Sequence, residues 1–193
     1  MKILREVGIT ILIAVAVFVC LRLTVQSYTV VMSSMEPNFQ DGDCLMVNKV
    51  SYRSSGPQRG EVIIFDPPFS SEYPYIKRVI GLPGETVEIK DGKVSINGTP
   101  LEEDEYIMAP PNYTMPATEV PEDEYLVLGD NRNNSNDSHN SWTVPRDNII
   151  GRAWFTYWPP SKLGVVKHYS YPEFYGAGEQ EMMVSHSFGV QLE

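Results

Sequence analysis

The sequence is poor in cysteine and histidine, with only two and three of them among 193 residues. Cys20 falls inside an apolar run and Cys44 well outside it, so we expect no bridge between them and no disulfide framework. The histidines lie far apart in the chain, and neither a CxxC nor an HExxH motif occurs. The sequence therefore predicts neither a metal site nor a cofactor.

Basic residues are also scarce. The chain has 15 Lys and Arg against 25 Asp and Glu, a formal net charge of −10. Proteins that bind nucleic acid place clustered Lys and Arg against phosphates, so this composition argues against a nucleic-acid partner. The acidic residues concentrate in two runs, 102–105 and 122–124, which we expect to be solvated loops. The length allows one medium domain with its own core, plus an attachment.

One long apolar run is present, residues 7–25, and Arg22 is the only charge in it. As a helix it spans roughly 28 Å at about 1.5 Å per residue, close to the hydrocarbon thickness of a bilayer. A cleavable secretory signal and a buried core helix are the alternatives. The run is long for a signal core, no small-x-small cleavage pattern follows it, and it has no polar face. We therefore expect an uncleaved transmembrane anchor that contacts the lipid bilayer.

The basic residues near this anchor predict its orientation. Lys2 and Arg5 precede the run, and after Arg22 there is no basic residue until Lys49. By the positive-inside rule, residues 1–6 stay in the cytoplasm and everything after the anchor lies outside. The sequence thus predicts a single-pass protein of the cell membrane with its main domain on the outer face.

Residues 40–160 alternate short apolar runs with turn signals, which is typical of β-rich domains. We expect a β-rich domain over 26–167, with Asp91-Gly92 as a tight hairpin turn. Residues 98–123 hold five prolines and are expected to be a long excursion outside the core. The tail 168–193 lacks periodicity, so we expect it to be disordered or to rest on the domain or the membrane. The candidate strands are 44–50, 61–65, 75–81, 86–89, 93–96, 124–129 and 149–158.

Three segments could carry chemistry: the stretch around Ser34 beyond the anchor, the candidate strand that contains Lys77, and the polar loop 129–142. Each has an ordinary structural interpretation, such as an edge-strand lysine facing water or a polar surface loop. A serine becomes a nucleophile only beside a base. The sequence does not exclude His139 as that base, although no G-x-S-x-G elbow accompanies Ser34.

Lysine is the other possible base, provided that its amine is neutral. At its reference pKa of about 10.4, only ~0.1% of a free lysine is neutral near pH 7.5. Burial disfavours the charged form and lowers a lysine pKa by up to several units. Ile76, Val79 and Ile80 surround Lys77 in the sequence and could supply such an environment. Ser34 and Lys77 therefore form a chemically sensible dyad.

In this order and behind one anchor, these segments resemble type I signal peptidase, the bacterial leader peptidase. The resemblance covers roughly residues 7–160. Ser34-Met35-x-Pro37 looks like the nucleophile box of that family, and the stretch from Lys77 to Gly84 looks like its general-base box. Three further stretches of this chain resemble the other sequence motifs of the family: 41–49, 59–65 and 129–138. Each motif is a modest signal alone, and five in register are a strong one.

The resemblance implies a mostly antiparallel β-sheet protease domain that removes signal peptides from secreted preproteins. Ser34 would attack the scissile carbonyl, and its backbone N–H would contribute to the oxyanion hole. Lys77 would take the serine proton and return it to the leaving amine, while Ser135 would hydrogen-bond and orient that lysine. Asp137 and Asp130 would support the site. Substrates would bind as extended strands, with small side chains at the first and third positions before the cut.

The chain departs from the family pattern at three places. Met32 stands two residues before the nucleophile, where the family usually has Ser or Gly, so a seryl oxyanion donor is missing. We expect Ser33 or the backbone to compensate. His139 replaces an arginine, and because imidazole titrates near ~6.5, a contact between His139 and Asp137 should weaken at alkaline pH. Residues 140–143 replace an aromatic-Gly pattern, which puts the local geometry of the loop in question.

Two other functions compete with this interpretation. One is a related self-cleaving Ser–Lys protease, against which the anchor and the lack of a DNA-binding segment count. The other is a catalytically impaired, membrane-anchored β-rich binding module of the same fold, which Met32 keeps open. The sequence predicts no particular oligomeric state.

Overall fold

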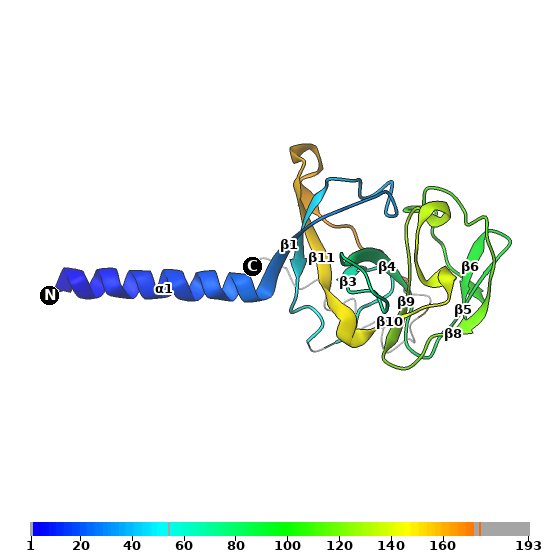
Figure 1. The fold of residues 1–193 in the computed structure, drawn as a ribbon, viewed down its shortest axis with the longest axis horizontal. Helices are drawn as coiled ribbons and strands as arrows, with labels where there is room; N and C mark the ends of the chain where they lie inside the picture. The colour runs from blue at the N-terminus through cyan, green and yellow to red at the C-terminus, as the bar shows by residue number, and fades with distance from the viewer. Residues whose placement is uncertain (1, 54, 172–173, 175–193) are drawn as a thin grey trace, which may run out of the picture.

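The chain begins with one long helix, α1 (Lys2–Thr24), which leads directly into the first strand. The computed structural model describes residues 2–53, 55–171 and 174. Its apolar stretch Arg5–Thr24 is long enough to cross a membrane, and none of it is buried against the rest of the protein. In Figure 1 the helix projects away from the domain, and its apolar side chains from Val7 onward are exposed within the described part of the chain.

The rest of the described chain is built from short strands and single turns of 3-10 helix. The strands are β1 (Val25–Thr29), β2 (Cys44–Asn48), β3 (Val62–Phe65), β4 (Tyr75–Gly81), β5 (Thr86–Lys90), β6 (Lys93–Ile96), β7 (Thr99–Pro100), β8 (Met115–Glu119), β9 (Glu124–Leu128), β10 (Val144–Pro145), β11 (Ile149–Trp158) and β12 (Gly164–Val165). The 3-10 turns are η1 (Arg132–Asn134), η2 (Ser138–Asn140), η3 (Arg146–Asn148) and η4 (Pro160–Lys162).

These strands form two antiparallel sheets, which confirms the mostly antiparallel β fold. The larger sheet has the order β1-β2-β11-β3-β4-β9-β10, with β12 paired to β11, and the smaller one has the order β7-β6-β5-β8. Figure 1 shows β1 and β11 next to the end of α1 and the smaller sheet on the far side of the domain. The hairpin between β5 and β6 turns at Asp91 and Gly92, whose φ angles are 51° and 76°, as that residue pair predicts.

Apolar clusters cover both faces of the middle of the larger sheet. One cluster gathers Met35, Phe39 and residues of β2 and β3, and another lies on the opposite face around Ile63, Phe65 and Val127. β3 is buried along its whole length, and β4 is buried from its second residue onward. Any polar side chain on β4 is therefore removed from water.

Residues 98–123 differ from the sequence-based expectation, because they contribute to the core. Leu101, Tyr106, Met115 and Val120 pack with β5, β6 and β9 in one apolar cluster. β8 lies within this segment and pairs with β5 in spite of Pro116. The segment is therefore rich in proline and acidic residues and still packs on the core, instead of forming a long loop in solvent.

The described start of the tail packs on the domain. Tyr169 donates a backbone hydrogen bond to the carbonyl of Gly60, and Tyr171 is buried in the same cluster as Tyr106. Phe174 packs against that cluster as well. Residues 172–173 and 175–193, which make up most of the predicted tail, lie outside the described residues.

Candidate active site

Ser34 lies in the loop that joins β1 to β2, and this loop is held from two sides. Met35 is fully buried and fixes the loop to the apolar cluster beneath it. Asn131 holds it from the other side, because its backbone N–H donates to the Ser34 carbonyl at 3.0 Å and its Nδ2 donates to the Ser33 carbonyl at 3.1 Å. The position of the serine is thus set by packing and by a polar clamp.

Lys77 reaches Ser34 from the middle of the larger sheet. β4 runs between β3 and β9, so the interpretation of Lys77 as an edge-strand lysine facing water is wrong. Its side chain is 3% exposed, and Nζ donates to Ser34 Oγ at 2.7 Å and to the carbonyl of Ile76 at 2.8 Å. The hydroxyl and the amine are therefore within direct hydrogen-bond distance.

Burial also changes the chemistry of this amine. Loss of solvation lowers the pKa of Lys77 to about 8, although Asp137 and Asp130 oppose the shift. Roughly a quarter of the amine is then neutral at pH 7.5, compared with about one part in a thousand for a free lysine. A neutral amine has a lone pair, so it can accept the proton of an adjacent hydroxyl.

The next residue on β4, Arg78, has a different environment. It is 1% exposed and lies against Asp130, which is itself fully buried. Arg78 Nε and Nη2 donate to the two oxygens of Asp130 at 2.8 and 2.6 Å, and Nη1 donates to the Gly60 carbonyl at 2.8 Å. Burial opposes the charge, but the contact with Asp130 outweighs it and raises the pKa of Arg78. Asp130 therefore pairs with Arg78 rather than with the Ser34–Lys77 pair.

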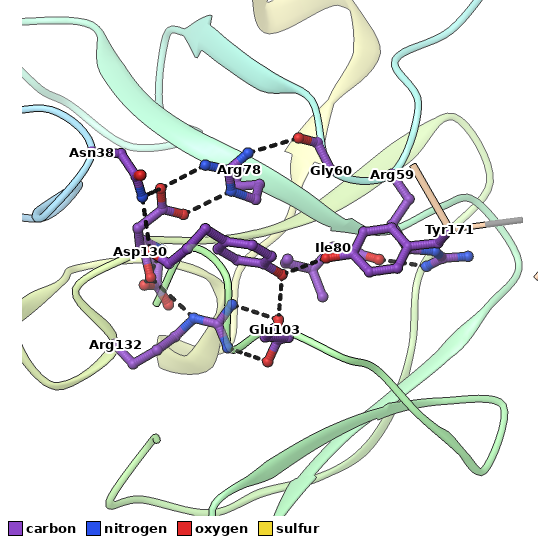
Figure 2. A network of polar contacts seen from close by, with 12 residues as sticks. Asn38, Arg59, Gly60, Arg78, Ile80, Glu103, Asp130, Arg132 and Tyr171 are labelled. Carbon is purple, nitrogen blue, oxygen red and sulfur yellow. Dashed lines mark hydrogen bonds and ion pairs between the residues drawn. The ribbon is translucent and has the colours of Figure 1, made fainter. Parts of the chain in front are cut away.

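A second buried pair continues this network, as Figure 2 shows. Arg132 donates to both oxygens of Glu103 at 2.7 and 2.6 Å, and Glu103 is only 5% exposed. Glu103 also accepts a hydrogen bond from Tyr106, whose hydroxyl in turn accepts one from Tyr171. The run 102–105 thus supplies a buried ion pair, which corrects the expectation that all of it is solvated.

Asp137 fixes the polar loop near the serine. It is fully buried, and its Oδ2 accepts a hydrogen bond from the Gly129 N–H at 2.8 Å. Its Oδ1 lies 2.7 Å from His139 Nδ1, and the His139 ring stacks on Tyr113 with centroids 4.3 Å apart. His139 therefore contacts Asp137 and, through its ring, Tyr113. The hydroxyl of Ser34 contacts Lys77 instead.

Ser135 lies beside the same site without the contact that the sequence predicts. Its Oγ is buried and has no hydrogen-bond partner within the described residues, and the amine of Lys77 bonds to Ser34 and Ile76. A Cβ on Gly129 would lie 2.3 Å from Ser135 Oγ and 2.5 Å from the Ser34 carbonyl. Only glycine allows the two loops to approach this closely.

The serine and the lysine open into a groove of about 1290 Å³. One wall runs from Ser27 to Ser34, and others come from 71–77 and 133–136. Met32 lines the groove, is 67% exposed and has a φ of 70°, which is uncommon for a residue other than glycine. Its N–H donates to Asp41 at 2.8 Å, whereas the Ser34 N–H donates no hydrogen bond within the described part of the chain.

The hydroxyl of Ser33, one candidate to replace the missing seryl donor at position 32, contacts a neighbouring amide. Ser33 Oγ accepts a hydrogen bond from Asn134 Nδ2 at 2.9 Å, and this contact concerns only the acceptor side of the hydroxyl. Within the part of the chain that the structure describes, no three His, Cys, Asp or Glu side chains gather as metal ligands.

Two of these positioning residues escape sequence reasoning. Asn131 belongs to a predicted polar loop, but nothing in the sequence indicates that it clamps the loop of Ser34. Glu103 lies in an acidic run whose composition suggests solvent exposure. Both contacts join segments far apart in the chain, so no local pattern could reveal them.

Comparisons with known proteins agree with this geometry. The family model described as "Signal peptidase, peptidase S26" matches residues 4–158. A probable signal peptidase I-2 of Synechocystis sp. is 43% identical over 167 residues, which cover 83% of this chain and 76% of that protein. The signal peptidase I of Leptolyngbya laminosa is 52% identical over 68% of each chain. The signal peptidase IB of Staphylococcus aureus is 34% identical over 89% of this chain and 97% of its own. The chain therefore belongs to the signal peptidase family, peptidase S26.

Proposed function

We propose that this family member is a membrane-anchored serine endopeptidase that removes signal peptides from preproteins, with Ser34 as nucleophile and Lys77 as general base. The distance of 2.7 Å between Ser34 Oγ and Lys77 Nζ carries the proposal. The lowered pKa of Lys77, about 8, supports it, because a base must be partly neutral at working pH.

The reaction follows from this pair. Lys77 Nζ takes the proton of Ser34 Oγ while that oxygen attacks the scissile carbonyl, and the negative charge gathers on the carbonyl oxygen. The Ser34 N–H, which has no other partner within the described residues, is available to bind that oxygen. Lys77 then gives the proton to the leaving amine as the C–N bond breaks. Lys77 next takes a proton from the water that attacks the ester on Ser34, and it returns this proton to Ser34 Oγ as the acid is released.

Other residues hold this pair in place. Ser135 is a positioning residue: it lines the same groove as Lys77, and its buried hydroxyl has no other partner among the described residues. Asp137 holds Gly129 and therefore the loop that packs against the Ser34 carbonyl. Asp130 neutralises Arg78 directly below the loop. We assign these three residues to orientation rather than to bond making.

The groove suits a preprotein in extended form. Its lining includes segments 27–34 and 71–77, which end at Ser34 and Lys77 themselves. An extended peptide can bind in such a groove through its main chain, as in β-strand addition, while pockets select alternate side chains. We propose that the residues before the cut bind in this way.

Membrane attachment rests on α1 and on the strands beside it. Within the described residues, the stretch Arg5–Thr24 of α1 is not buried against the domain, which supports an anchor over residues 7–25. Trp154, Trp158, Leu163 and Val165 are also exposed on β11, on β12 and between them, and β11 lies beside the end of α1 in Figure 1. With residues 1–6 in the cytoplasm, domain 26–167 and its groove lie on the outer face of the cell membrane.

Cleavage of a preprotein by the purified full chain in detergent tests the dyad. We expect Ser34→Ala and Lys77→Ala each to reduce kcat/KM at least about 10⁴-fold, and the double variant to be no worse than either, because the two residues act as a unit. Lys90→Ala is the matched control, since Lys90 is an exposed lysine in the other sheet. Cleavage that survives in both single variants would show that the dyad is wrong. A wild-type chain that binds preproteins without cutting them would instead identify an impaired binding module.

A further inference from the structure

A second, smaller cavity lies away from the groove. It has a volume of about 240 Å³ and lies between the segment that follows β2 and the start of β11. Lys49, Arg53 and Arg146 contribute to its wall, together with Ile149 and Ile150. Sites for drug-sized ligands are typically about 300–1,000 Å³, so this cavity suits a small headgroup.

The three cations of this cavity are unusual in so acidic a protein, because they have no carboxylate partner among the described residues. Most other cations of the domain are paired: arginines 59, 78, 132 and 152 and lysines 162 and 167 each lie within 4.0 Å of an Asp or Glu. No carboxylate of the described residues lies that close to Lys49, Arg53 or Arg146. Asp147 is the only acidic residue in the wall of the cavity. Net positive charge therefore remains there for an anion to neutralise.

The cavity begins where the helix ends. The N–H of Lys49 donates to the carbonyl of Thr24, the last residue of α1, at 2.9 Å. Asn48 is the register partner of Val25, the residue that follows the helix. On the far wall, Arg146 Nη2 contacts the Tyr52 carbonyl at 3.4 Å, which ties η3 to the same loop. An anchor in the bilayer thus brings these cations to the level of the lipid headgroups.

We propose that Lys49, Arg53 and Arg146 bind the phosphate of an anionic phospholipid in the leaflet from which α1 emerges. The proposal rests on the membrane attachment proposed above. Guanidinium groups match phosphate oxygens with parallel N–H donors, and cations at this level are attracted to anionic lipid surfaces. Ile149 and Ile150 give the cavity an apolar wall that suits the carbon skeleton below the phosphate. Binding of this kind would fix the rotation of the domain about the helix axis.

Lipid retention by the full-length protein tests this site. The protein is reconstituted in nanodiscs of phosphatidylcholine mixed with phosphatidylglycerol, and the lipids that stay bound after release are identified by native mass spectrometry. The double variant Lys49→Gln/Arg53→Gln is compared with Lys90→Gln/Lys93→Gln, which removes the same charge from the β5–β6 hairpin on the far sheet. Each cation near an anionic surface contributes roughly fivefold in affinity, so we expect binding of phosphatidylglycerol to weaken about 25-fold in the first variant only.

Two further arms separate the possible results. Cleavage of a soluble peptide in detergent should be equal in wild type and both double variants, which shows that they fold and that peptidase activity is independent of the lipid site. A thermal shift with inorganic phosphate tests whether a free anion suffices. Equal retention of phosphatidylglycerol by all three proteins would overturn the proposal, and so would stabilisation by inorganic phosphate without any retained lipid.

Discussion

Lys77 and Arg78 are neighbours on β4, both almost fully buried, yet their surroundings give them opposite properties. Successive side chains of a strand point to opposite faces, so each enters a different layer of the protein. Arg78 meets the two oxygens of Asp130, and its pKa rises. Lys77 meets a hydroxyl and a carbonyl, and its pKa falls to about 8. Burial alone therefore does not decide the charge of a cation: the contact with a carboxylate does.

β4 thus has two different faces in the site: a reactive face, which carries Lys77, and a supporting face, which carries Arg78. On the supporting face, charges are matched in pairs that hold loops together, as Arg78–Asp130 and Arg132–Glu103 do. On the reactive face, the amine has no such partner among the described residues, which costs stability and, under the proposed function, provides a base. Asp137 and Asp130 act on Lys77 only as background charges that raise its pKa.

Methionine in place of Arg78 and, separately, in place of Lys77 should change the free energy of unfolding in opposite directions, and these are the largest effects that we expect. Arg78→Met leaves Asp130 buried and unpaired, so we expect it to lower the free energy of unfolding by about 3–5 kcal/mol. Lys77→Met removes an amine whose pKa is lowered from 10.5 to about 8, and this shift corresponds to a gain of up to about 3 kcal/mol near pH 7. Denaturant unfolding of both variants measures these changes.

The pH dependence of the stability gained in Lys77→Met tests whether the buried amine causes it. The pKa of Lys77 is lower in the folded chain, so the unfolded chain binds more protons between pH 8 and 10.5. Wild-type stability should therefore rise with pH across that interval, and the advantage of Lys77→Met should disappear. A variant that is less stable than wild type at pH 7 would contradict the assigned cost of the buried amine.

The pH profile of cleavage addresses the reactive face directly. Only the neutral amine accepts a proton, so kcat/KM should fall about tenfold per pH unit below pH 8 and level off above it. The total change between pH 6 and pH 8 is then roughly 50-fold. Unfolding curves recorded over the same range exclude loss of structure as the cause. A flat profile over this range would mean that Lys77 is not the base.

Position 32 tests whether the reactive face lacks an oxyanion donor. Removal of one such donor costs other enzymes about 10²–10³ in rate, so Met32→Ser should raise kcat, by about tenfold if its hydroxyl is only partly aligned. Met32→Ala is the control, because it removes the bulk of the side chain without adding a donor. Equal rates for the two variants would show that only the bulk of Met32 matters.

His139 gives the smallest expected effect. It contacts Asp137 at 2.7 Å, and Asp137 is one of the charges that raise the pKa of Lys77. Arginine places a permanent positive charge against Asp137, so His139→Arg should offset part of the effect of Asp137 on Lys77 and raise kcat/KM below pH 8 by a few-fold. Identical acidic limbs in wild type and variant would refute this role.

The sequence predicts the strands that form the middle of the larger sheet, because their apolar runs are long and bounded by turn residues. β3, β4, β9 and β11 all lie within a residue or two of their expected bounds. β1 has the polar sequence VQSYT and is a strand because it pairs with β2. β8 contains a proline and depends on β5 in the same way. Such strands are set by their neighbours and cannot be found from local pattern.

The same division holds for the candidate site. The motifs around Ser34 and Lys77 predict their pairing, since a serine nucleophile needs a base and a buried lysine can be one. The contact of Asp130 with Arg78 joins residues 52 positions apart and required the fold. For Ser135 the resemblance to the family predicts a contact that the structure lacks: its hydroxyl makes no hydrogen bond to Lys77 among the described side chains.

The direct join between α1 and β1 has a consequence for where a substrate is cut. Helix α1 ends at Thr24 and β1 begins at Val25, without a linker between them. β1 is paired with β2 along all five of its residues, so it is a rigid connection of up to about 16 Å. Ser34 follows five residues beyond the end of β1. Under the proposed anchoring of α1 and cleavage by Ser34, the length of β1 sets how far above the bilayer a peptide bond must emerge before the serine can reach it.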